Sequence, residues 1–189
     1  METLPDLLGP NLRLILVGIN PSLYAVARGH YFARPQNRFW PALSQSNIGQ
    51  PICAKLGVER LYPEHDHLLP SFSIGLTDVV KIPSSNASFV TPAMYREGAP
   101  RLQKTLADCS PKVIAFHGMT GFRPFLKHAM GEDPKSAQLG LQAMKFDGKP
   151  IFVLPNPSGA NARYLLADLV GFYNELAKLL DRVAPSLSS

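Results

Sequence analysis

The sequence predicts an α/β protein in which helices cover a mostly parallel β-sheet. Short apolar runs of strand length alternate along the chain with segments whose apolar residues have helical spacing. This order favours parallel strands, because each crossover between parallel strands needs a connection as long as a helix. The chain has 189 residues, enough to bury a full core, and we expect residues 1–189 to form one domain.

The first half of the chain is expected to contain a strand, a helix, a strand and a helix, over residues 12–17, 37–48, 71–76 and 92–109. The first strand is an apolar run that ends at Gly18. Thr91 is a typical N-cap, and Pro92 suits the first position of the second helix. Pro100 should kink that helix, because proline removes one of its backbone hydrogen bonds.

The second half is expected to contain a strand, a helix, a hairpin and a final helix, over residues 112–117, 120–130, 144–154 and 165–180. The hairpin is indicated by Asp147-Gly148, a dipeptide typical of tight turns, between two apolar segments. The final helix is the clearest element, because its apolar residues recur with the 3.6-residue period. Residues 184–189 are expected to be a frayed tail.

The composition is that of a globular protein, with 46% hydrophobic and 17% charged residues. No apolar run approaches the ~20 residues that a membrane helix needs, so we expect no membrane association. The first ten residues, METLPDLLGP, are acidic where a signal peptide is basic, and we therefore expect a cytoplasmic protein. Cys53 and Cys109 lie far apart and are expected to be reduced thiols, too few for a four-thiolate metal site.

The formal net charge is +5, and the acidic residues are unevenly distributed. Residues 7–58 and 148–167 contain no Asp or Glu, and residues 67–96 contain only Asp78. One explanation is a basic surface that faces a polyanion. The other is a buried, loop-rich half of the protein that excludes acids. Within the first segment, Arg38 is expected to form either an ion pair or a phosphate contact.

Two expected strands end in nearly the same loop. The strand over residues 12–17 is followed by Asn20-Pro21-Ser22, and residues 151–154 are followed by Asn156-Pro157-Ser158. Asn-Pro is common in ordinary turns, but two copies at two strand ends of one α/β protein indicate a shared site. Ligands of such sheets bind at the carboxyl ends of the strands, and proline holds the preceding asparagine extended. We therefore expect both asparagines to face one cleft.

The segments "GINPS…GHYFARPQNRFWPAL" and "LPNPSGANAR", with "GLTDVV" and "VIAFHG" between them, carry a family resemblance. The chain resembles the mismatch-specific uracil-DNA glycosylases, a bacterial branch of the thymine-DNA glycosylase family within the uracil-DNA glycosylase superfamily. The resemblance implies a three-layer α/β/α sandwich. It also implies a monofunctional DNA glycosylase that flips uracil or a related damaged or mismatched pyrimidine out of DNA. Hydrolysis of the N-glycosidic bond would leave an abasic site, without a metal or another cofactor.

Hydrolysis of this bond requires a water molecule held below C1′ and stabilisation of the charge that develops on the departing base. By resemblance, Asn20 holds the water; its amide can orient the water but cannot accept a proton. The resemblance implies a base pocket formed by Gly18, Ile19, Pro21, Ser22 and Phe32. Phe32 matches the aromatic residue on which the flipped base stacks. Ser22 stands where the strict uracil enzymes have a bulky tyrosine, which implies room for 5-substituted pyrimidines.

The second loop matches the family's DNA-binding wedge, which enters the helix where the base leaves. The residues concerned are Asn156, Pro157, Ser158, Gly159, Ala160, Asn161 and Arg163. Ala160 and Asn161 replace the larger wedge of relatives, and one extra residue precedes Arg163. A smaller plug stabilises the flipped state less, so mismatch reading is expected to be weak.

Asp78 has no acidic counterpart in the better-known family members. One interpretation is a structural carboxylate that caps local N–H groups or pairs with Lys81. The other is a catalytic carboxylate, which faces the cleft at a strand end and accepts the proton that Asn20 cannot. Both interpretations are open from the sequence.

Two other classes of function are compatible with an α/β chain. The first is a non-catalytic DNA-binding module of the same fold. The second is an unrelated nucleotide-binding protein, but neither GxGxxG nor GxxxxGK[ST] occurs in the sequence. Under the favoured interpretation, the partner is uracil- or mismatch-containing DNA, double-stranded, with cleavage of single strands left open. The protein is then expected to be a monomer that works at the nucleoid.

Overall fold

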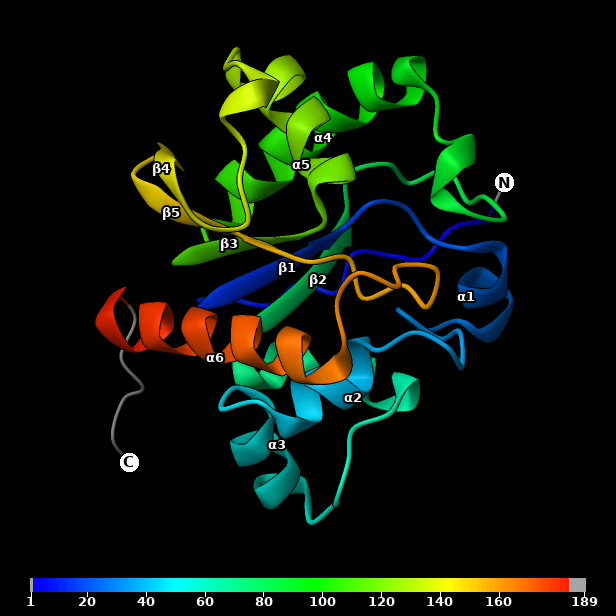
Figure 1. Ribbon diagram of the computed structural model, residues 1–189, viewed down its shortest axis with the longest axis vertical. Coiled ribbons are helices and arrows are strands. Elements are labelled where there is room, and N and C mark those ends of the chain that lie inside the picture. The colour runs from blue at the N-terminus through cyan, green and yellow to red at the C-terminus, as the bar shows by residue number, and fades with distance from the viewer. Residues whose placement is uncertain (1, 184–189) are drawn as a thin grey trace.

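The computed structural model describes residues 2–183, whose centre is a five-stranded sheet in the order β2-β1-β3-β5-β4 (Figure 1). The strands are β1 (Leu14–Gly18), β2 (Ile74–Asp78), β3 (Val113–His117), β4 (Gly140–Phe146) and β5 (Lys149–Leu154). All neighbouring pairs are parallel except β4 with β5, which is antiparallel at one edge. The loops that follow the four parallel strands therefore emerge along the same edge of the sheet.

Helices cover both faces of the sheet, which confirms the α/β/α sandwich (Figure 1). One face carries α4 (Pro92–Cys109) and α5 (Met119–Phe125), and the other carries α2 (Phe39–Gln45), α3 (Gly49–Leu56) and α6 (Leu166–Val183). Side chains of β1 alternate between the layers: Leu14 and Leu16 pack in the core on the α6 side, whereas Ile15 and Val17 pack on the α4 side. The period of two along a strand thus divides the apolar residues between two cores.

The helix predicted over residues 37–48 is wrong in its extent. Helix α2 ends at Gln45, and α3 is a separate helix that the spacing did not reveal. The Ser46 hydroxyl accepts hydrogen bonds from the backbone N–H of Ile48 and of Gly49, both at 3.3 Å, which turns the chain. Gly49 packs tightly there, since a Cβ at this position would lie 1.9 Å from the Leu43 carbonyl oxygen. The short α1 (Leu23–Arg28) was also not predicted.

The second predicted strand is displaced along the chain. The expected range was 71–76, whereas β2 spans Ile74–Asp78. A 3-10 helix occupies Pro63–Phe72, and Ser73 ends it with a φ of 60° in the left-handed region. Asp78 is consequently the last residue of the strand rather than a residue of the following loop.

Several local predictions are confirmed. The Thr91 hydroxyl accepts a hydrogen bond from the Met94 N–H (3.3 Å), and α4 has the predicted bounds. It continues through Pro100 as one helix of 18 residues, and the kink expected at Pro100 stays a prediction. Asp147 and Gly148 have φ values of 46° and 75°, as the hairpin turn between β4 and β5 requires. Helix α5 continues into a π-helical segment, Leu126–Met130, within the predicted range. The predicted tail, residues 184–189, lies outside the described residues.

Within residues 2–183, no helix combines the length and apolar character needed to cross a membrane. Cys53 is buried and Cys109 half-buried, and both are free thiols. The same part of the chain contains no group of three His, Cys, Asp or Glu side chains placed to hold a metal ion.

Candidate functional site

A cavity of about 390 Å³ lies where the loops after β1, β2 and β5 meet the end of β3, and we call it the edge cavity. The site residues predicted from the sequence that line it are Gly18, Ile19, Asn20, Pro21, Ser22, Phe32, Asp78, Asn156, Ser158, Gly159 and Ala160. Strand β3 separates β1 from β5 in the sheet, yet both Asn-Pro-Ser loops reach the same cavity. The expectation that the two asparagines share one cleft is confirmed.

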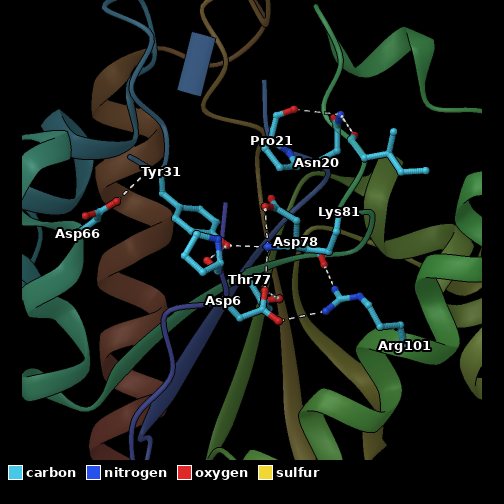
Figure 2. A network of polar contacts seen from close by, with 11 residues as sticks. Asp6, Asn20, Pro21, Tyr31, Asp66, Thr77, Asp78, Lys81 and Arg101 are labelled. Atoms are coloured by element: carbon cyan, nitrogen blue, oxygen red, sulfur yellow. Dashed lines mark hydrogen bonds and ion pairs between the residues drawn. The ribbon is translucent and has the colours of Figure 1, made fainter. Parts of the chain in front are cut away.

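The Asn20 side chain is held by the loop that follows β2 (Figure 2). Its Nδ2 donates to the carbonyl oxygen of Ile82 (3.0 Å) and to the Ser84 hydroxyl (2.8 Å). Backbone hydrogen bonds between Ser84 and Pro21 (3.1 Å) and between Leu23 and Ser84 (3.0 Å) fasten the two loops together. Among the described residues, none donates to Oδ1 of Asn20. The amide oxygen is therefore an oriented acceptor at the cavity wall, suited to a water molecule.

Phe32 has a strained backbone at the cavity wall. Its φ is 53°, in a region that bulky residues rarely adopt, and such strain is found mainly where the surroundings enforce it. The ring stacks on Phe39 with centroids 4.0 Å apart and an interplanar angle of 16°. His117 contacts the ring edge-on at 5.2 Å. The ring of Phe32 is thus immobilised beside the edge cavity and supplies an aromatic wall to it.

Asp78 is the buried carboxyl group of the cavity. It pairs with Gly18 in the register of β1 and β2, and a Cβ on Gly18 would lie 2.3 Å from its Oδ1. The side chain is only 4% exposed, and Oδ2 has no hydrogen-bond partner; the Lys81 ammonium is 3.9 Å away. Burial raises the pKa of Asp78 to about 7, although Lys81 acts in the opposite direction. A carboxyl group with such a pKa can both accept and release a proton near neutral pH.

A network of polar side chains lies behind Asp78 (Figure 2). The Asp6 carboxylate accepts hydrogen bonds from the Thr77 hydroxyl (2.7 Å), Lys81 (2.9 Å) and Arg101 (3.1 Å). Although burial raises the pKa of Asp6, its hydrogen bonds with Thr77 and Lys81 hold that pKa below the usual value. The Tyr31 hydroxyl also accepts a hydrogen bond from Lys81 (3.0 Å). Asp6 and Arg101 were not predicted as site residues, because nothing in the local sequence relates them to Asp78.

His117 forms the back of the cavity at the end of β3. Its Nε2 is hydrogen-bonded to the Tyr173 hydroxyl of α6 at 2.6 Å. Burial lowers the pKa of His117 to about 3, so the imidazole is neutral. The rule that strand ends carry sites would have indicated His117, since it is the last residue of a predicted strand.

Arg38 determines the position of the loop after β5, which corrects the expectation of an ion pair or a phosphate contact. Its guanidinium group donates to three backbone carbonyl groups of that loop, those of Ser158 (2.9 Å), Asn161 (2.6 Å) and Tyr164. Its backbone N–H donates to the Pro157 carbonyl oxygen (3.0 Å). The loop is therefore held by one side chain of the chain's first half.

The remaining residues of that loop have different surroundings. Gly159 is packed closely, because a Cβ there would lie 2.8 Å from the Gln36 carbonyl oxygen. Pro157, Asn161 and Arg163 do not line the edge cavity. Asn161 donates from its side chain to the Asn156 carbonyl oxygen (2.9 Å), while the exposed Arg163 guanidinium lies 5.5 Å from the Tyr164 ring centroid. Arg163 is thus placed outside the cavity, on the surface beside it.

Further residues line the edge cavity without having been predicted. They are Leu4, Ala25, Tyr31, Arg34, Gln36, Asn37, Ser84, Ser85, Asn86, Ala87 and His117. Residues 84–87 belong to the loop after β2, and the strand-end rule would have found them had the strand been placed correctly. Leu4 comes from the N-terminal segment, and no sequence signal connects it to the site.

One comparison with known proteins bears on this site. The family model described as the uracil DNA glycosylase superfamily matches residues 5–178. The matched region includes both Asn-Pro-Ser loops, Asp78, and the Asp6 network behind it.

Arg38→Met is expected to loosen the loop after β5, because three carbonyl groups lose a charged donor at once. We expect the free energy of unfolding to fall by roughly 2–3 kcal/mol, and trypsin to cleave after Arg163 at least tenfold faster. Both are measured on purified protein, by thermal melting and by mass spectrometry of the fragments. Arg34→Met is the matched control, since Arg34 donates to a single carbonyl oxygen, that of Ser85 (2.6 Å). Equal effects of the two substitutions would contradict the assigned role of Arg38.

Proposed function

Because the chain belongs to the uracil-DNA glycosylase superfamily, we propose that it is a catalytically active DNA glycosylase of the mismatch-specific type. Membership in the superfamily supports DNA as the partner and cleavage of a base from DNA as the reaction. The finer proposal is a monofunctional enzyme that excises uracil and related pyrimidines. The observation that carries it is that one cavity is lined both by Asn20, whose amide is held by two hydrogen bonds, and by the buried carboxyl group of Asp78, whose Oδ2 has no hydrogen bond.

In the proposed reaction, the flipped base enters the edge cavity and stacks on Phe32. Asn20 Oδ1 accepts a hydrogen bond from a water molecule, and the Asp78 carboxylate removes a proton from that water. The water oxygen bonds to C1′ as the N-glycosidic bond breaks, and the bonding electron pair leaves with N1 of the base. The departing anion then takes a proton from solvent, so the products are the free base and an abasic site.

The small side chain of Ser22 supports the proposed substrate class. Ser22 lines the edge cavity, and its hydroxyl accepts a hydrogen bond from the Ala25 N–H (3.0 Å) as the N-cap of α1. A small side chain at this position leaves space for a substituent at C5 of a pyrimidine. Ala160 of the wedge loop also lines the edge cavity, and its side chain is small. A plug of that size supports weak reading of the opposite base.

Asp78→Asn is expected to reduce uracil excision at least tenfold, because the amide cannot accept the proton of the attacking water. A single-turnover gel assay on a uracil-containing oligonucleotide measures the rate. Thermal stability is not expected to fall. The pKa of Asp78 is raised from the ordinary value of 3.8 to about 7 in the folded protein, so its ionisation lowers stability as pH rises between these two values. Above them the loss is complete and constant, and the amide avoids that cost.

Asn20→Ala and the double variant complete this test. Asn20→Ala alone is expected to retain measurable activity, and the double variant almost none. Normal excision by Asp78→Asn, together with an inactive Asn20→Ala, would mean that Asp78 is structural. A chain that binds DNA but shows no excision with any pyrimidine lesion would be the non-catalytic DNA-binding module.

Phe32→Ala is expected to keep the fold and reduce excision about ten- to a hundredfold, from the loss of ~1–3 kcal/mol of stacking on the base. The same gel assay gives the rate, and circular dichroism checks the fold. Phe72→Ala is the control, because Phe72 is a half-buried phenylalanine that packs on the core away from the edge cavity. Wild-type excision by Phe32→Ala would leave Phe32 as a core residue only.

Arg163→Ala is expected to weaken binding to duplex DNA and to affect cleavage of single strands less, because Arg163 lies outside the cavity on the wedge loop. Fluorescence anisotropy measures binding, and paired single- and double-stranded substrates measure excision. Arg182→Ala removes an exposed arginine at the far end of α6 and serves as the control. An equal loss on both substrates would show that Arg163 does not contact the duplex.

A further inference from the structure

Two cations lie close to Asp78, yet neither neutralises its carboxylate at short range. The Lys81 ammonium is 3.9 Å from Oδ2, whereas it is 2.9 Å from the Asp6 carboxylate. The Arg101 guanidinium donates to the backbone carbonyl oxygen of Asp78 and forms its ion pair with Asp6 at 3.1 Å. Both cations are thus held by Asp6, and Oδ2 of Asp78 is left without a hydrogen bond.

Asp6 reaches this place because the N-terminal segment is bound to the free edge of the sheet. Leu7 and Leu76 exchange two backbone hydrogen bonds (2.9 and 2.8 Å) as an antiparallel bridge beside β2. The Tyr31 hydroxyl donates to the Pro5 carbonyl oxygen (3.0 Å), and Leu4 is buried at the cavity wall. These contacts fix the backbone on both sides of Asp6, so its carboxylate has a defined position (Figure 2).

We propose that Asp6 is a positioning residue for the reaction: it holds Lys81 and Arg101 in ion pairs and thereby keeps the Asp78 carboxylate free to act as the base. This inference rests on the proposed function, in which Asp78 takes the proton of the attacking water. Asp6 itself does not line the edge cavity and contacts no reacting atom.

The charges that face Asp78 come from three segments of the chain and act on its carboxyl group in opposite directions. Lys81, after β2, and Arg101, on α4, both lower the pKa of Asp78, whereas Asp6 raises it. Strand β1 contributes Gly18, which carries no charge, and the Tyr31 hydroxyl is bound to Lys81. Neutral His117 adds no charge at the cavity. Without the Asp6 charge, the remaining local charges would be two cations and one carboxylate. Lys81 would then be free to pair with Asp78 directly.

Asp6→Asn tests the proposal, because it removes the charge and nearly preserves the shape. We expect the acid limb of the pH profile of single-turnover excision to move to lower pH by about one unit, as an opposite charge nearby produces. The plateau rate at high pH should also fall, since a carboxylate of lower pKa is a weaker base. Titration of the Asp78 carboxyl carbon by NMR, with its signal assigned by Asp78→Asn, should show the same shift without any substrate.

Three further variants separate this role from a purely structural one. Asp6→Glu keeps the charge and should keep the wild-type limb. Asp6→Asn combined with Lys81→Met should move the limb back toward wild type, because the freed cation is gone. Asp66→Asn is the matched control: Asp66 is another hydrogen-bonded aspartate, more deeply buried than Asp6, and it binds the Tyr31 N–H (2.9 Å) but neither Lys81 nor Arg101. It should leave the limb in place. If Asp6→Asn does not fold, Asp6→Ser removes the same charge and is used in place of Asp6→Asn.

An unchanged acid limb and an unchanged Asp78 titration in Asp6→Asn would overturn the proposal, even if Asp78→Asn shows the expected loss of excision. Failure of the proposed function has a different signature, which is wild-type excision by Asp78→Asn. In that case, an NMR titration of Asp78 that shifts in Asp6→Asn would establish the electrostatic effect alone, and the catalytic role of Asp6 would be overturned.

Discussion

The register between β1 and β2 is the constraint on which the site depends. It places Asp78 beside Gly18, where the carboxylate occupies space that any side chain on β1 would fill. The same pairing brings the loop after β2 against the loop after β1, so that Ile82 and Ser84 can hold the Asn20 amide. A shift by one residue would turn Asp78 to the opposite face of the sheet and separate these groups.

The site is held rigid by contacts between segments that are distant in the chain. Arg38 binds three carbonyl groups of the loop after β5, and the stack of Phe32 on Phe39 maintains an uncommon backbone conformation. Under the proposed function, this rigidity favours catalysis. An oriented acceptor and a fixed aromatic wall need no rearrangement when the base arrives, so less binding energy is lost in ordering the site.

The two aspartates near Lys81 and Arg101 differ in their electrostatic surroundings. Asp6 is paired with Lys81 and Arg101 at short range and has a lowered pKa. Asp78 has only the 3.9 Å contact with Lys81 and no hydrogen bond to its Oδ2, and burial raises its pKa to about 7. Two carboxylates near the same cations thus have opposite properties, because short hydrogen bonds favour the charged form and burial without them disfavours it. This difference makes Asp78, and not Asp6, the group suited to exchange a proton.

The sequence by itself determined β1, β3 and β5, the Asp147-Gly148 turn, α6 and the meeting of the two Asn-Pro-Ser loops. Periodicity, turn chemistry and the strand-end rule are properties of short segments. Only the tertiary structure decided the break between α2 and α3, the end of β2 at Asp78, and the partners of Arg38 and Asp6. These features depend on contacts across the fold: Gly49 packs on Leu43 at a turn, and Asp6 meets Arg101 through an edge bridge. Pairings of this kind have no local signature, since the residues become neighbours only when the sheet and its two helical layers have assembled.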